Sequence, residues 1–213
     1  MAKSKSPLFG LEASGTVGDS VVFAKWRGVQ YARRHVIPAN PRTVEQMKTR
    51  NAFLFLNQLW FHAPPLFHEP WAAYATGRPL TDRNAFIKFN VPLLRDASNL
   101  ASLVGSPGVG GGFALASLSA QGGFGEINCS ATVPQLPPGW SVDYVVFAVI
   151  SDVDPHVPFT GVIRAQSDTT APYGILFVEL PEGQYRVLAW ARYTKPDNSK
   201  AFSPSLITSA EVL

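Results

Sequence analysis

Residues 104–112 read Val-Gly-Ser-Pro-Gly-Val-Gly-Gly-Gly, and this stretch divides the 213-residue chain into two parts. Five glycines and one proline in nine residues disfavour both a helix and a paired strand, so a flexible linker is predicted over 105–112. The charge changes sign at the same place. Residues 1–104 carry 13 Lys/Arg and 6 Asp/Glu, a net +7, whereas residues 105–213 carry 5 and 9, a net −4. We therefore expect two domains, 1–104 and 113–213, with different neighbours.

Upstream of the linker, the pattern predicts a hairpin followed by helices. Residues 21–26 and 29–35 alternate as strands do, and Arg27-Gly28 between them supplies a turn. Thr43-Val-Glu-Gln46 fits a capping box, and no Gly or Pro follows before Pro64, so we expect a helix over 44–63. Shorter helices are expected over 69–75 and 84–90. The N-terminal domain is therefore predicted to be α+β.

Composition indicates that this N-terminal domain assembles with partners. Hydrophobic residues make up 46% of the chain and charged residues only 15%, against about 25% charged in ordinary globular domains. So few charges leave apolar area on the surface, and large apolar patches mark contact sites. The long helix is apolar around much of its circumference, as helices buried on several sides are. The residues that we expect to form the assembly interface are Trp26, Tyr31, Arg33, Arg34, Phe53, Phe55 and Trp60.

Downstream of the linker, short strands recur at regular spacing. They are expected over 113–120, 125–133, 141–151, 157–165, 174–179, 184–193 and 206–212, separated by turns rich in Gly, Pro and Asn. Seven short strands in about 100 residues are typical of an immunoglobulin-like β-sandwich.

The side chains that catalysis or metal binding would use do not form a convincing set. His62 and His68 flank a proline pair with Glu69 nearby, and a zinc site needs three or four ligands in a tetrahedral array. The carboxylates of Asp152 and Asp154 fit a solvated turn better than a calcium loop. The single cysteine, Cys129, lies in an alternating strand as a small hydrophobe. We therefore expect no enzyme activity, no cofactor, no metal and no membrane-spanning segment.

Part of the chain resembles a known group of proteins. The order of residues 15–34 (GTVGDSVVFAKWRGVQYARR), 38–46 (PANPRTVEQ), 50–53 (RNAF), Trp71 and 84–90 (NAFIKFN) is similar to uncharacterised virion proteins of tailed bacteriophages. This resemblance covers about residues 10–90. It implies a particle component in the virion, made in the host cytoplasm, with copies of itself and other virion proteins as partners.

A second resemblance concerns residues 180–190 (LPEGQYRVLAW), which are similar to the tyrosine corner and following strand of fibronectin type III domains. It implies that the Tyr185 hydroxyl donates to backbone a few residues upstream. Leu180 and Tyr185 are one residue closer together than in that pattern, and Trp140 lies later in the sandwich than expected.

The leading hypothesis is thus a non-enzymatic structural component of a phage head, neck or tail that assembles through its N-terminal domain. One alternative is a module that binds host-surface glycan or protein through the sandwich loops, with Trp140 or Phe159 at the loop tips. A further alternative is contact of the basic hairpin with DNA, for which phosphate neutralisation by Lys and Arg would supply the affinity.

Overall fold

The computed structural model describes residues 14–213 except 19, 27–28, 38 and 41. The chain divides into two units, Met1–Arg42 (unit 1) and Thr43–Leu213 (unit 2). Within the described residues the fold is α+β, with three helices and antiparallel sheets. The division falls before the first helix, which corrects the predicted boundary at 104/113. The physical reason is that the helices bury their apolar side chains against the sandwich.

Unit 1 contains a three-stranded antiparallel sheet in the order β1-β2-β3. Its strands are β1 (Gly15–Val17), β2 (Val21–Trp26) and β3 (Val29–Arg34). In the β2-β3 hairpin, Val22 pairs with Arg33 and Ala24 pairs with Tyr31. The predicted hairpin is confirmed, and β1 adds a third strand on its β2 side.

Unit 2 opens with three helices, α1 (Val44–His62), α2 (Pro65–Ala75) and α3 (Asp82–Leu94). The Thr43 hydroxyl caps α1 by accepting from the Gln46 backbone N–H at 3.4 Å, so the predicted start of the long helix is confirmed. Thr81 caps α3 in the same way, at 3.2 Å. Helix α2 begins at Pro65, earlier than the expected start at residue 69. A proline is tolerated in the first turn because the backbone N–H groups there have no partner within the helix.

Two antiparallel sheets follow. The larger sheet has the order β4-β11-β10-β7-β8, with β12 also pairing with β10, and the smaller sheet has the order β5-β6-β9. The strands of the larger sheet are β4 (Pro107–Val109), β7 (Ser141–Ser151), β8 (Ile163–Asp168), β10 (Gly183–Thr194), β11 (Lys200–Pro204) and β12 (Leu206–Val212). Those of the smaller sheet are β5 (Ser117–Gly122), β6 (Ile127–Thr132) and β9 (Tyr173–Phe177). The expected strand over 157–165 was placed too early, since β8 begins at Ile163.

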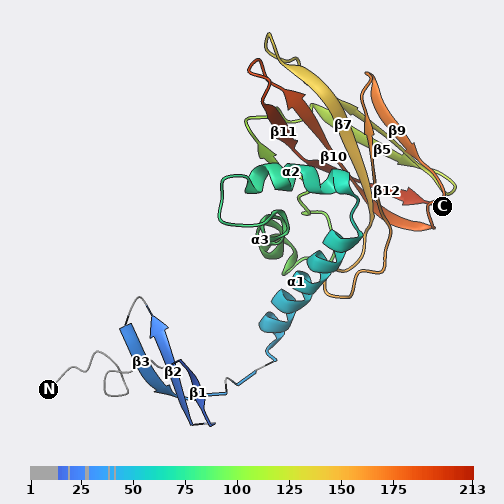
Figure 1. Ribbon diagram of the computed structural model, residues 1–213. Coiled ribbons are helices and arrows are strands. Elements are labelled where there is room, and N and C mark those ends of the chain that lie inside the picture. The colour runs from blue at the N-terminus through green and yellow to red at the C-terminus, as the bar shows by residue number, and fades with distance from the viewer. Residues whose placement is uncertain (1–13, 19, 27–28, 38, 41) are drawn as a thin grey trace. The chain divides into compact units, whose positions relative to one another are not determined.

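The larger sheet is the middle of three layers, with the helices on one face and the smaller sheet on the other (Figure 1). Strand β7 shows why. Val146, Ala148 and Ile150 pack with the helices, while Val145 and Phe147 alternate with them and pack with β6 and β9. A strand buried on both faces has a continuous apolar run, which residues 145–150 provide.

The glycine-rich stretch is packed structure, which corrects the predicted linker over 105–112. Strand β4 lies inside it and pairs with β11. The Gly105 carbonyl accepts a hydrogen bond from Trp71 Nε1 at 2.8 Å, and its N–H donates to Ser205 Oγ at 3.0 Å. A Cβ at Gly105 would lie 2.9 Å from Leu188 Cδ2. Glycine is used here for close approach of the backbone to the sheet, a role that composition alone does not distinguish from flexibility.

Candidate assembly surfaces

The described residues of unit 1 form no core of their own. None of its side chains that the structure describes is buried. A small sheet needs an apolar face packed on something else to be stable in water. The described part of unit 1 shows no such packing.

The hairpin of unit 1 has apolar side chains on both of its faces. Paired residues share a face in an antiparallel ladder, so Phe23 and Ala32 lie on one face and Ala24 and Tyr31 on the other. Phe23 and Ala24 are half-buried, and Tyr31 is 40% exposed. Strands with apolar residues on both sides are normally covered on both sides.

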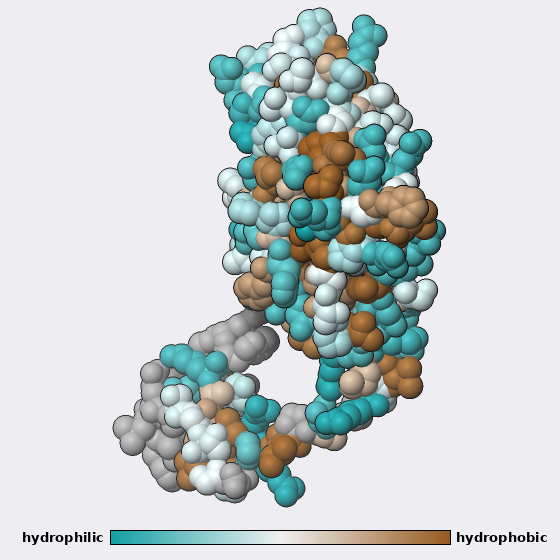
Figure 2. Space-filling model, turned by 90° about the vertical axis from the view of Figure 1, so that its right-hand side faces the viewer, coloured by the Kyte–Doolittle hydropathy of each residue, from teal (hydrophilic) through white to brown (hydrophobic). Residues whose placement is uncertain are grey.

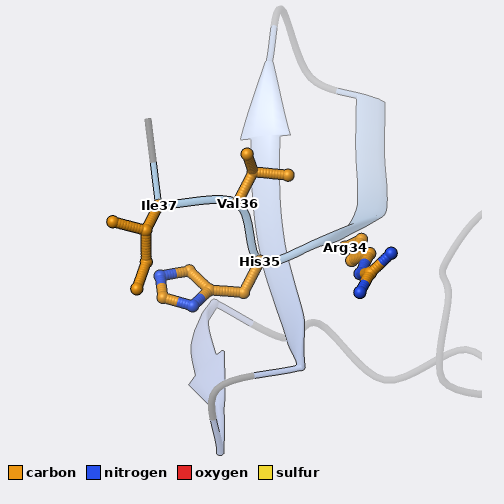
Figure 3. A pocket seen from close by; sticks show the side chains of 4 residues that line it. All are labelled: Arg34, His35, Val36 and Ile37. Carbon is orange, nitrogen blue, oxygen red and sulfur yellow. The ribbon is translucent and has the colours of Figure 1, made fainter. Parts of the chain in front are cut away.

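A pocket of about 390 Å³ lies just after β3 and is lined by Arg34, His35, Val36 and Ile37. Val36 is 61% exposed and Ile37 is 81% exposed. In Figure 3 the His35 and Ile37 side chains point to the same side, and the Arg34 guanidinium lies apart from them. The pocket therefore combines an apolar wall with a cation at its margin.

The surroundings of this pocket are basic. Residues 1–42 carry seven Lys/Arg and two Asp/Glu, a net +5. Tyr31, Arg33 and Arg34 are exposed, as an assembly surface requires. Trp26 belongs to β2, but its side chain lies outside the described residues. The hairpin thus presents apolar area within a positive field, which attracts acidic surfaces.

Two of the residues expected in the interface are core residues instead. Phe55 is fully buried and meets the Phe159 ring edge-on at 5.6 Å. Trp60 is 6% exposed and stacks on His68 at 4.0 Å. Their helix does not need a partner subunit to bury them, because α3 and the sandwich already do so. Phe53, in contrast, is 51% exposed.

The exposed side of α1 forms an apolar stripe. Leu54 is 48% exposed and Phe61 is 68% exposed, and together with Phe53 they share one arc of the helix. Apolar groups also gather across the middle of the unit 2 face in Figure 2. In the sandwich the exposed large apolar residues are Phe124, Val157, Leu176, Val178 and Leu213.

The groups that could have carried chemistry have structural partners. His62 Nδ1 lies 2.8 Å from the Gln58 carbonyl, and His68 Nε2 lies 3.1 Å from that of Trp60. Cys129 is fully buried, and burial raises the pKa of its thiol to about 12, which removes the nucleophilic thiolate. No group of three metal-ligating side chains occurs in the part of the chain that the structure describes.

The carboxylates that could have bound a cation are also occupied. Asp152 accepts from Arg186 Nη2 at 2.8 Å and from the Leu100 N–H at 2.8 Å, which ties the loop after α3 to the sheet. Asp154 accepts from the His156 N–H at 2.8 Å within its own turn.

No helix among the described residues is long and apolar enough to cross a bilayer.

A polar cluster joins α2 to the larger sheet. The Tyr144 hydroxyl donates to Glu69, and Arg192 Nη1 donates to Tyr144 Oη at 2.9 Å. Arg192 Nε also lies 3.2 Å from Asp143 Oδ2. Burial raises the pKa of Tyr144 to about 12, and the Glu69 hydrogen bond adds to this. The cluster is closed within unit 2 and acts as an anchor for the helix.

Tyr185 makes the hydrogen bond that the sequence led us to expect. Its hydroxyl donates to the Pro181 carbonyl at 2.8 Å, and the side chain is 2% exposed. This bond fixes the entry of β10 into the sheet, next to the turn that ends at Gly183.

Comparisons with known proteins found solved structures that align with part of this chain. No family model and no curated protein matches the chain. A solved chain described as a myokine structure aligns over 47% of this chain and 97% of its own length, with 15% identity and a TM-score of 0.34. Fibronectin(III)-like modules of Clostridium thermocellum CbhA align over 46% of this chain and 92% of their own, with 28% identity and a TM-score of 0.28. TM-scores this low do not establish a shared fold, and none of the comparisons supports the resemblance to virion proteins.

Sequence reasoning missed three exposed apolar groups, namely Phe61, the Val36-Ile37 pair and Phe124. Phe61 could have been found by projecting α1 onto a helical wheel with the buried arc fixed by Phe55 and Leu59. Phe124 stands in a Gly-Gly-Phe-Gly turn between two strands. An aromatic residue in such a turn is exposed unless another element covers it, and this signal was available from the sequence.

Proposed function

We propose that this protein is a non-enzymatic structural component that assembles through unit 1 with copies of itself and with other proteins of a larger particle. The observation that carries the proposal is the absence of any buried side chain among the described residues of unit 1. Association buries its apolar residues and thereby offsets the entropy lost on ordering the hairpin. The particle we propose is that of a tailed bacteriophage, on the sequence resemblance of residues 10–90 alone.

In this proposal unit 2 is the rigid body that unit 1 tethers to its neighbours. We propose that its sandwich is of the immunoglobulin and fibronectin III type. Counted from β5, the first, second and fifth strands (β5, β6, β9) form one sheet. The third, sixth, seventh and eighth (β7, β10, β11, β12) belong to the other, a division similar to that of immunoglobulin-like folds. The fourth strand, β8, pairs with β7. The Tyr185 hydrogen bond supports the same type.

The alternative of host-ligand binding by the sandwich loops has one observation in its favour. A largely apolar pocket of about 360 Å³ at one end of the sandwich is lined by residues that include Val133, Leu136 and Tyr173. The aromatic residues expected at the loop tips are not there, however. Phe159 is 4% exposed, and Trp140 packs edge-on against Phe113 at 4.9 Å. Binding of unit 2 to glycans on an array would support this alternative, and the absence of binding to any glycan would exclude glycan recognition.

DNA contact by the basic hairpin remains the weaker alternative. It predicts an affinity that falls steeply as salt is raised. Filter binding with duplex and single-stranded DNA tests it, and no retention at low salt would exclude it.

Sedimentation velocity over a range of concentrations tests the proposed function. The full chain is expected to form oligomers, while residues 43–213 are expected to stay monomeric, because that piece contains both apolar cores. A full chain that remains a monomer at every concentration refutes self-association through unit 1. Equal association of the two proteins would place the contact in unit 2.

A further inference from the structure

Phe124 is the most exposed large apolar residue that the structure describes, at 87%. It lies in the turn between β5 and β6. Backbone hydrogen bonds hold this turn from two sides: Gly125 N–H donates to the Leu213 carbonyl at 3.3 Å, and Leu180 N–H donates to the Gly125 carbonyl at 2.9 Å. Leu213 N–H in turn donates to Gly123 at 3.1 Å. The ring is therefore displayed on an ordered platform, away from the core.

The backbone next to this turn is closely packed. A Cβ at Gly122 would lie 1.7 Å from the Glu211 carbonyl oxygen, so β5 and β12 approach as closely as glycine allows. An exposed aromatic ring on a rigid support is typical of the central residue of an interface, because little entropy is lost when it binds.

Acidic side chains surround Phe124. A depression of about 600 Å³ beside it is lined by Phe124, Glu182, Gly183, Glu211, Val212 and Leu213. Glu126, Glu182 and Glu211 are exposed, and none of the three forms an ion pair with another described residue. We call Phe124, Glu126, Glu182 and Glu211 the Phe124 surface. Its partner should be basic and should offer an apolar recess.

Unit 1 of the same chain has both properties. It carries a net +5, with Arg33 and Arg34 exposed on β3. The pocket of about 390 Å³ at Arg34–Ile37 has the apolar side chains of Val36 and Ile37 in its lining, and this volume is ample for one phenyl ring.

We propose that the Phe124 surface of one copy docks on unit 1 of a second copy, with Phe124 in the Arg34–Ile37 pocket and Glu182 and Glu211 within the positive field around the end of β3. The inference rests on the proposed function and names the partner of unit 1. Two different surfaces meet in this contact, so it is heterologous and repeats from copy to copy, producing a chain or a closed ring. The charge complementarity steers the encounter, while burial of the phenyl ring supplies affinity.

Sedimentation velocity of full-length variants tests the contact. Phe124→Ser is expected to weaken self-association at least about 10-fold, which corresponds to about 1.4 kcal/mol. Leu176→Ser, which removes another exposed apolar residue (49%) from the same sandwich, is the matched control and should associate as the unaltered chain does. Unchanged protection of the Cys129 thiol from labelling shows that each variant is folded.

Charge reversal gives the sharper result. Two double variants are compared, Arg33→Glu/Arg34→Glu and Glu182→Lys/Glu211→Lys. Each should self-associate weakly on its own. An equal mixture of the two should associate again, because each reversed surface then meets a surface of opposite charge. If Phe124→Ser and Glu182→Lys/Glu211→Lys associate normally, the Phe124 surface is not the partner. The proposed function would still stand in that case if Arg33→Glu/Arg34→Glu abolished association, whereas it fails if the unaltered chain is monomeric throughout.

Discussion

Replacing Phe67 with Ala tests whether the helices and the sandwich form one cooperative unit. Phe67 lies on α2, is fully buried, and meets Trp190 of β10 edge-on at 5.8 Å and Phe86 of α3 at 5.6 Å. Truncation of a buried Phe to Ala costs about 3–5 kcal/mol. That cost raises the unfolded population roughly 150- to 5,000-fold at 25 °C.

The single thiol provides the assay, because Cys129 lies between the two sheets in the core that faces away from the helices. Its labelling by a disulfide reagent reports opening of the sandwich, while far-UV circular dichroism reports loss of the helices. In one cooperative unit, Phe67→Ala should accelerate labelling by the factor given above, and both signals should shift to the same lower urea concentration. Phe67→Leu serves as a control and should shift both signals less than Phe67→Ala does, because it leaves a smaller cavity.

A helical signal that melts earlier while Cys129 stays protected as before would refute this reasoning. The helices and the sandwich would then be separate domains, as the glycine-rich stretch first suggested.

Three further predictions concern unit 2. Gly105→Ala should lower the free energy of unfolding by about 1–3 kcal/mol in urea titrations, because its Cβ would crowd Leu188; a neutral result would indicate a flexible linker after all. Tyr185→Phe should cost about 1 kcal/mol and lower Tm by about 2–4 °C, since the bond to Pro181 is lost; an unchanged Tm would contradict this. Partial burial opposes ionisation of Asp143, but hydrogen bonds to its carboxylate outweigh it and lower the pKa below 3.8. The stabilisation that the Asp143 carboxylate provides is therefore present above pH 3.8 and is lost as the pH falls through the lowered pKa. Asp143→Asn should make the free energy of unfolding depend less on pH in the acid range. A variant with the same acid dependence as the unaltered chain would contradict this prediction.

Local signals in the sequence predicted the elements well where one physical cause dominates. The Thr43 cap fixes the start of α1, and largely apolar runs bounded by Pro and Gly or Asn turns give β12 and most of β10. The Tyr185 hydrogen bond follows from a short motif whose geometry is set by the chain within four residues.

Prediction failed where packing between distant segments decides. Phe55 and Trp60 look the same as Phe53 in the sequence, and only the position of α3 and Phe159 shows which of them are buried. Likewise, glycines at 105–112 have the composition of a linker, but the nearby Trp190 and Phe202 require a backbone without side chains. Long-range contacts of this kind leave no periodic trace in one sequence.

Amide hydrogen exchange in β2 and β3, followed as the concentration of the full chain is raised, tests most directly whether unit 1 is stable only in an assembly. At concentrations where the chain is monomeric, these amides are expected to exchange within about 10-fold of unprotected rates, and to become protected as oligomers form. Strong protection of β2 and β3 in the dilute monomer, comparable to that of β7 and β10, would contradict the account.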